Sequence, residues 1–132
     1  MKIWIAAGVL GFVAACVSDE MPGPQEGAAL FADNCVACHG ASATGDGPLA
    51  TGLSPRPADL THISARNGGT FPRARVLSEI DGYLKGSHPN RAMPEFGAVL
   101  TGETVPVEVD GVLTPTPRPL AALLAYLEDI QS

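Results

Sequence analysis

Cys35-Val36-Ala37-Cys38-His39 is the stretch that decides the fold of this 132-residue chain. Two thiols at this spacing can each form a thioether with a vinyl group of haem, and the histidine that follows places an imidazole beneath the iron. The pattern therefore predicts one covalently attached haem c. Cys35 and Cys38 would be its anchors, and His39 the first axial ligand.

Two other uses of a Cys-x-x-Cys pair find less support in the sequence. A structural zinc site needs four ligands, but the chain has only one further cysteine, Cys16, and two further histidines, His62 and His88. A thioredoxin-like redox pair belongs to a βαβ unit, whereas the residues just before Cys35 are typical of a helix. Haem attachment is the best interpretation of the motif.

The N-terminal segment has the composition of an export signal. Lys2 is followed by an uncharged, mostly apolar run from Ile3 to Ala15. As a helix this run would be about 20 Å long, which is short of the ~30 Å hydrocarbon core of a bilayer. Residues 1–15 are therefore predicted to be a signal peptide rather than a membrane span.

The residues around Cys16 indicate a lipid anchor. Val13-Ala14-Ala15-Cys16 resembles the lipobox of bacterial lipoproteins, in which the cysteine receives a diacylglyceryl group and becomes the mature N-terminus. Two acyl chains on one cysteine hold a protein stably on a membrane. The alternative is an ordinary cleavage site, which would leave one odd thiol in an exported protein. We expect a bacterial periplasmic protein held on a membrane by lipidated Cys16.

The remaining chain divides into a tether over residues 16–25, rich in polar residues, Gly and Pro, and one domain over residues 26–132. About one hundred residues suffice for a single, thin core. Helical periodicity dominates, so the predicted fold class is all-α. The predicted segments are 24–37, a short helical turn near 57–66, 72–85 ended by Gly86, and 119–131 with the apolar stripe Leu120, Leu123, Leu124, Leu127 and Ile130.

Gly27 is unusual within the first predicted helix, because glycine costs roughly 1 kcal/mol relative to alanine in a helix interior. We interpret it as a point of close approach by another element. The last helix is the best candidate, with Tyr126 resting against the gap that Gly27 leaves.

An iron that only carries electrons needs both axial positions filled, since an open position would bind oxygen or small anions. The candidates for the second ligand are Met93, His88 and His62. Met93 is favoured because Pro94 holds its backbone extended; His88 is the alternative, and both histidines are otherwise expected at the surface. A thioether ligand stabilises ferrous iron, which implies a comparatively high reduction potential.

Several stretches together resemble the class I cytochromes c, and the resemblance runs from Gly27 to Gln131. It rests on Gly27-Ala-Ala-Leu-Phe31, Cys35-x-x-Cys38-His39-Gly40, Gly45-Asp-Gly-Pro48, Arg91-Ala-Met93-Pro94 and Leu123-Leu-Ala-Tyr126-Leu127.

The resemblance implies three main helices plus loops around one haem, with the first and last helices crossing near Gly27 and Tyr126. It implies that Met93 lies in the ligand loop and that the Pro48 carbonyl accepts a hydrogen bond from His39. Residues 101–117 depart from the family pattern: they are an insertion, with a possible small β-hairpin near 105–114 around Asp110-Gly111. This insertion would cap the haem, form a partner surface, or be a passive loop.

The function expected from these features is one-electron transfer, without catalytic residues, between a redox donor and an acceptor. The alternatives are a haem c subunit of a larger oxidoreductase complex, or a five-coordinate or bis-histidine haem protein. Residues 56–91 carry six basic residues against three acidic ones, within a chain of formal net charge −6. That segment either guides an acidic partner or is ordinary surface. The overall acidity argues against nucleic-acid binding.

Overall fold

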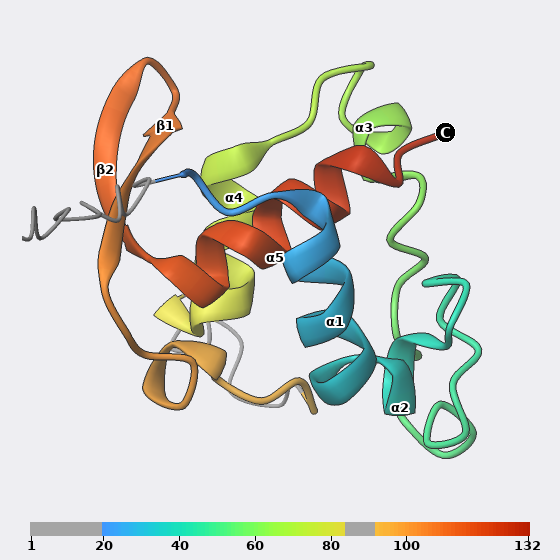
Figure 1. Ribbon diagram of the computed structural model, residues 1–132. Helices are drawn as coiled ribbons and strands as arrows, with labels where there is room; N and C mark the ends of the chain where they lie inside the picture. The colour runs from blue at the N-terminus through green and yellow to red at the C-terminus, as the bar shows by residue number, and fades with distance from the viewer. Residues whose placement is uncertain (1–19, 84–91) are drawn as a thin grey trace, which may run out of the picture.

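The computed structural model describes residues 20–83 and 92–132 (Figure 1). Within these ranges the chain forms five α-helices, a short 3-10 helix and a two-stranded antiparallel sheet. In chain order the elements are α1 (Pro24–Asn34), α2 (Val36–His39), α3 (Ile63–Arg66), α4 (Arg73–Asp81), the 3-10 helix η2 (Phe96–Ala98), β1 (Thr104–Val109), β2 (Val112–Pro117) and α5 (Arg118–Asp129).

Helix α5 forms the centre of the core. It is started by prolines, which need no backbone N–H partner in a first helical turn. The predicted apolar stripe is buried along its length: Leu120, Leu123 and Leu124 are almost fully enclosed. The core continues through Phe31 of α1, Val76 and Ile80 of α4, and Phe96 of η2.

Helices α1 and α5 cross in backbone contact at Gly27, as the sequence predicted. A Cβ atom at Gly27 would lie 2.0 Å from the Ala122 carbonyl oxygen and 2.6 Å from the Tyr126 Cβ, so no other residue fits. Beside this contact the rings of Phe31 and Tyr126 pack with centroids 5.2 Å apart. The crossing therefore fixes the direction in which α1 runs toward Cys35.

The insertion forms the predicted hairpin, extended to residues 104–117. Asp110 and Gly111 have φ values of 50° and 82°, the positive pair of a type I′ turn, and Val109 is paired with Val112 across it. On β1 the side chains of Val105 and Val107 are buried against the core. Figure 1 shows the hairpin and α2 on opposite sides of α1 and α5, so the hairpin does not cover the Cys-x-x-Cys-His motif.

Two predicted boundaries were wrong. Helix α4 ends at Asp81 rather than Lys85, because Gly82 takes a left-handed φ of 100° that stops the helix; the predicted stop at Gly86 lies outside the described residues. Helix α1 begins at Pro24, as predicted for the segment 24–37, but it ends at Asn34; its first two residues belong to the predicted tether, residues 16–25. The end of that tether is already part of the fold, since Pro22 is buried and the Glu20 carbonyl accepts a hydrogen bond from Arg118 at 2.9 Å.

The crossing predicts the effect of a larger side chain at Gly27. The variant Gly27→Val should lose about 1–3 kcal/mol of stability or more, because the side chain must push α5 away. The matched control Ala29→Val, on the exposed side of α1, should lose only about 0.5–0.7 kcal/mol through helix propensity. Urea unfolding of the two haem-loaded variants measures the difference, and equal stabilities would refute the backbone contact.

Candidate functional site

The Cys-x-x-Cys-His motif sits on a sharp junction between α1 and α2. Cys35 ends α1, with its N–H bonded to the Phe31 carbonyl at 2.9 Å, and also caps α2. Its carbonyl in turn accepts the His39 N–H at 2.9 Å. The single turn of α2 brings both cysteines and His39 together at one end of α1, and all three side chains are partly buried.

The loop after the motif wraps back beneath α2. The N–H groups of Gly45, Gly47 and Leu49 donate hydrogen bonds to the carbonyls of His39, Cys38 and Ala37 respectively, at 2.8–3.1 Å. These bonds satisfy carbonyls that a one-turn helix leaves without partners. The loop over residues 45–49 is therefore held against α2 and stabilises the position of His39.

His39 is oriented by a residue that the sequence did not indicate. Its Nδ1 lies 3.0 Å from the Ala58 carbonyl oxygen. A carbonyl only accepts, so Nδ1 carries the proton and Nε2 keeps the free electron pair that a metal requires. Burial lowers the pKa of the His39 imidazole, outweighing the opposing effect of the bond to Ala58. The neutral form of His39 is therefore favoured, with Nε2 free to bind a metal.

This hydrogen bond corrects the expectation for Pro48. Pro48 is exposed and lies in a turn closed by the Ala50 N–H and the Gly47 carbonyl at 2.8 Å, while the acceptor for His39 comes from a different segment. No signal in the sequence could have identified Ala58, because every residue has a carbonyl and only the folded chain brings this one to the ring.

The two cysteines are partly buried free thiols. Burial, and to a smaller extent the neighbouring Cys38, raises the pKa of the Cys35 thiol to about 11. A thioredoxin-like nucleophile has the opposite property, a lowered pKa. The environment of Cys35 fits a thioether anchor in apolar surroundings.

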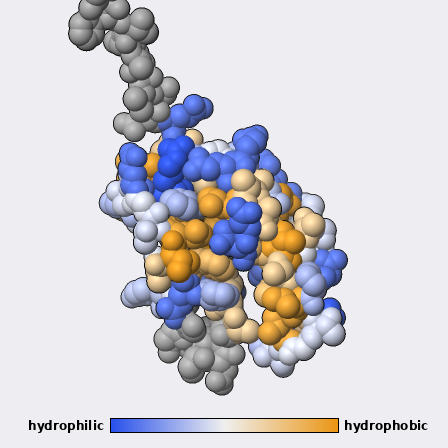
Figure 2. Space-filling model, turned by 60° about the horizontal axis from the view of Figure 1, so that its bottom comes forward, coloured by the Kyte–Doolittle hydropathy of each residue, from blue (hydrophilic) through white to orange (hydrophobic). Residues whose placement is uncertain are grey.

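Met93 shares the apolar environment of the motif. Cys35, Val36 and Met93 are all partly buried and pack against the same hydrophobic cluster, which contains Phe31 and Phe96. Figure 2 turns the lower side of Figure 1 toward the viewer and shows apolar side chains on both sides of a hollow in this face. The apolar cluster, the Cys35 thiol and the Met93 thioether have the chemistry that a haem site requires.

Of the two remaining histidines, the structure describes His62. His62 is exposed, and its Nδ1 lies 3.0 Å from an Asp59 carboxylate oxygen, as expected of a surface histidine. His88, the alternative to Met93, lies outside the described residues.

Of the basic residues in the segment 56–91, two have partners within the chain. The Arg73 Nε lies 3.3 Å from a Glu128 carboxylate oxygen, and Arg66 donates to the Asp59 carbonyl. Arg56 and Arg75 are exposed, and the other two lie outside the described residues.

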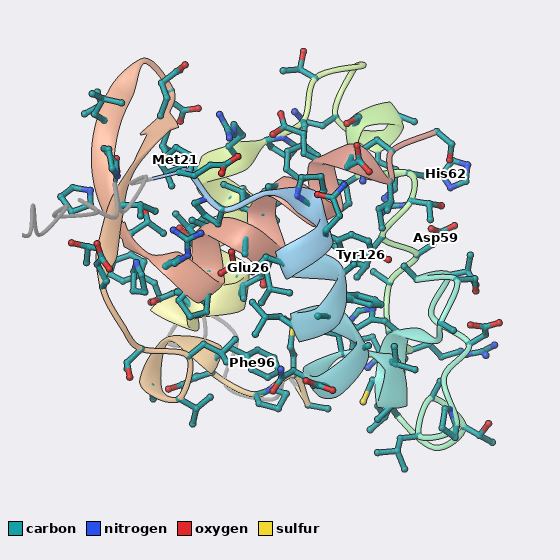
Figure 3. All side chains as sticks on the ribbon, viewed as in Figure 1. Met21, Glu26, Asp59, His62, Phe96 and Tyr126 are labelled. Atoms are coloured by element: carbon teal, nitrogen blue, oxygen red, sulfur yellow. The ribbon has the colours of Figure 1, made fainter. Side chains whose placement is uncertain are left out.

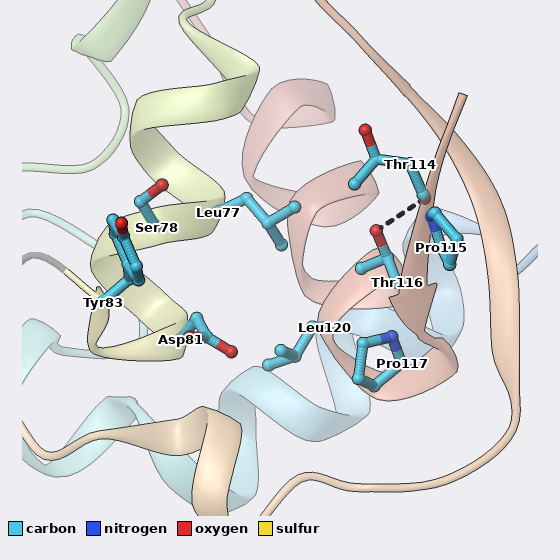
Figure 4. Close-up of a pocket in the computed structure, with 9 residues that line it drawn as sticks. All are labelled: Leu77, Ser78, Asp81, Tyr83, Thr114, Pro115, Thr116, Pro117 and Leu120. Carbon is cyan, nitrogen blue, oxygen red and sulfur yellow. Dashed lines mark hydrogen bonds between the residues drawn. The ribbon is translucent and has the colours of Figure 1, made fainter. Parts of the chain in front are cut away.

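A separate cavity of about 230 Å³ lies between α4 and the hairpin (Figure 4). None of the motif residues lines it. Its walls are Leu77, Ser78, Asp81, Tyr83, Thr114, Pro115, Thr116, Pro117 and Leu120.

Two further properties concern the part of the chain that the structure describes, residues 20–83 and 92–132. No helix there is both long and apolar enough to cross a bilayer. In the same ranges no three His, Cys, Asp or Glu side chains are gathered as a metal site.

Comparison with known proteins identifies the family. The family model for cytochrome c matches residues 24–131, so the chain belongs to the cytochrome c family. Searches of curated proteins and of solved structures found no match. The family binds covalently attached haem c, and haem-based electron transfer is its function.

The motif predicts how haem attachment responds to substitution. The double variant Cys35→Ala, Cys38→Ala should lose covalent haem, because no thiol remains beside the vinyl groups. Haem staining of a denaturing gel measures this, and each single variant should keep one thioether. The control Cys16→Ser should stain like the unmodified protein. Haem that stays bound to the denatured double variant would contradict the assignment.

Proposed function

We propose that this protein is a membrane-anchored monohaem electron carrier of the class I cytochrome c type, with His39 and Met93 as the axial ligands. Two observations support the proposal: Cys35 and Met93 both pack against the apolar core, and the bond from His39 Nδ1 to Ala58 leaves Nε2 free. The arrangement of α1, α4 and α5 supports the three-helix fold that the resemblance implies.

The bound haem supplies one-electron cycling between ferrous and ferric iron. The chain holds the ligands: α2 and the loop beneath it fix His39, and the apolar cluster steadies Met93. With both axial positions filled, small ligands are excluded, and the soft thioether favours the ferrous state. No side chain has to transfer a proton or form a bond in this activity.

The proposed location is the periplasmic face of a bacterial membrane, with lipidated Cys16 as the anchor. The described fold begins at Glu20, whose carbonyl is bonded to Arg118. The four residue-to-residue steps from Cys16 to Glu20 span at most about 14 Å. On this proposal the haem domain therefore stays close to the membrane and exchanges electrons with partners at its surface.

Redox partners are proposed to dock on the side of the molecule that carries the motif. Leu49, whose N–H is bonded to α2, has a side chain that is 62% exposed. Exposed apolar side chains on this side, visible in Figure 2, fit a transient protein contact.

Replacing Met93 tests the second ligand. Met93→Ala should abolish the weak red charge-transfer band of sulfur-ligated ferric haem and should let the ferrous protein bind carbon monoxide at neutral pH. The visible spectrum measures both effects. The matched control Met21→Leu, whose side chain is 47% exposed, should change neither. A band that survives in Met93→Ala, or that is missing from the unmodified protein, would overturn this ligand assignment.

Replacing Cys16 tests the anchor. Cys16→Ser should move the haem protein from the membrane fraction to the soluble periplasmic fraction, because the acyl chains that hold it are lost. Detergent phase partitioning, followed through haem absorbance, measures the change. Equal partitioning of both proteins would refute lipid anchoring while leaving the electron-transfer proposal intact.

A further inference from the structure

We propose that Asp59 is a positioning residue for the haem ligand His39: its carboxylate closes the turn that aims the Ala58 carbonyl at the His39 ring, and this tunes the reduction potential. The proposal rests on the proposed function only in that His39 ligates the iron. It does not depend on the identity of the second ligand.

The side chain of Asp59 is a local hydrogen-bond centre. One carboxylate oxygen accepts the Thr61 N–H at 2.8 Å and the Thr61 hydroxyl at 2.6 Å, and the other lies 3.0 Å from His62 Nδ1. Figure 3 shows Asp59 and His62 at the same edge of the molecule. This is the bonding of an Asx turn, in which the carboxylate fixes the backbone two residues ahead. The same bonds to Thr61 lower the pKa of Asp59, so the acceptor form predominates at neutral pH.

The acceptor of the His39 proton belongs to the peptide group that joins Ala58 to Asp59. The direction of that carbonyl is therefore set by the backbone conformation of Asp59, which the turn holds in place. Arg66 adds to this by donating to the carbonyl of Asp59 itself. The turn is therefore connected to the His39 ring through one peptide group and one hydrogen bond of 3.0 Å.

The residues beyond the turn are anchored independently of Asp59. The Leu60 N–H donates to the Ala43 carbonyl at 2.8 Å, and the Leu60 carbonyl accepts from Gln131 at 2.7 Å. The N–H of Ser132 donates to the Thr61 carbonyl at 3.0 Å. Loss of the Asp59 carboxylate should therefore let the Ala58–Asp59 peptide turn without unfolding the segment.

A hydrogen bond from Nδ1 to a carbonyl makes a ligating imidazole more basic. A more basic ligand gives more charge to the iron and favours the ferric state. When the Ala58 carbonyl points less directly at His39 Nδ1, the imidazole donates less charge to the iron. The ferrous state then becomes more stable relative to the ferric state. Loss of the Asp59 turn should consequently raise the reduction potential.

The test compares haem-loaded Asp59→Ala with Asp33→Asn, which removes a negative charge at an exposed position of α1. Spectroelectrochemistry should show a higher potential for Asp59→Ala than for the control. Both proteins are also labelled with 15N-histidine and studied in the ferrous state. Exchange of the His39 Nδ1–H with solvent should be roughly tenfold faster in Asp59→Ala than in the control, the order expected for loss of one hydrogen bond. Asp59→Asn, which keeps an acceptor oxygen, should restore most of both properties.

Unchanged exchange and potential in Asp59→Ala would overturn the proposal. A higher potential with unchanged exchange would also overturn it, because it would show a simple charge effect. If Asp59→Ala fails to mature, Thr61→Val removes one donor and keeps the backbone N–H, and it should shift both readouts less and in the same direction. If the unmodified protein itself carried no covalent haem, the proposed function would fail instead, so the two failures are distinguishable.

Discussion

The backbone contact between α1 and α5 at Gly27 is the constraint on which the rest of the structure depends. Because a Cβ atom would lie 2.0 Å from the Ala122 carbonyl oxygen, the two helices approach more closely than side chains normally allow. That approach brings Phe31 onto Tyr126 and buries the leucines of α5. It also fixes the direction of α1, which leads to Cys35 at the start of the motif.

The ligand side of the motif is held almost entirely by backbone groups. Three N–H groups of the following loop bond to the carbonyls of α2, and the Ala58 carbonyl bonds to the ring of His39. The segment that provides Ala58 is bonded in turn to the C-terminal residues Gln131 and Ser132. A histidine held in this way changes position little, which would suit its proposed role as a ligand in an electron carrier.

The hairpin is part of the core and not a cover for the motif. Val105 and Val107 of β1 are buried against α5, while the turn at Asp110-Gly111 lies away from α2. Within residues 101–117, the hairpin therefore does not cover the Cys-x-x-Cys-His motif. The hairpin contributes packing to a domain whose helices alone supply little apolar surface.

The sequence by itself determined the features that depend on neighbouring residues: the haem motif, the apolar stripe of α5, the type I′ turn, and the need for close approach at Gly27. Each follows from side-chain chemistry or backbone preference over a few positions. Tertiary structure decided the rest. Pro48 was expected to orient His39, but Ala58 does so, because any carbonyl can accept and only folding selects which one arrives. Likewise α4 ends at Asp81 rather than at the predicted Lys85, because Gly82 takes a left-handed conformation that the local sequence did not predict.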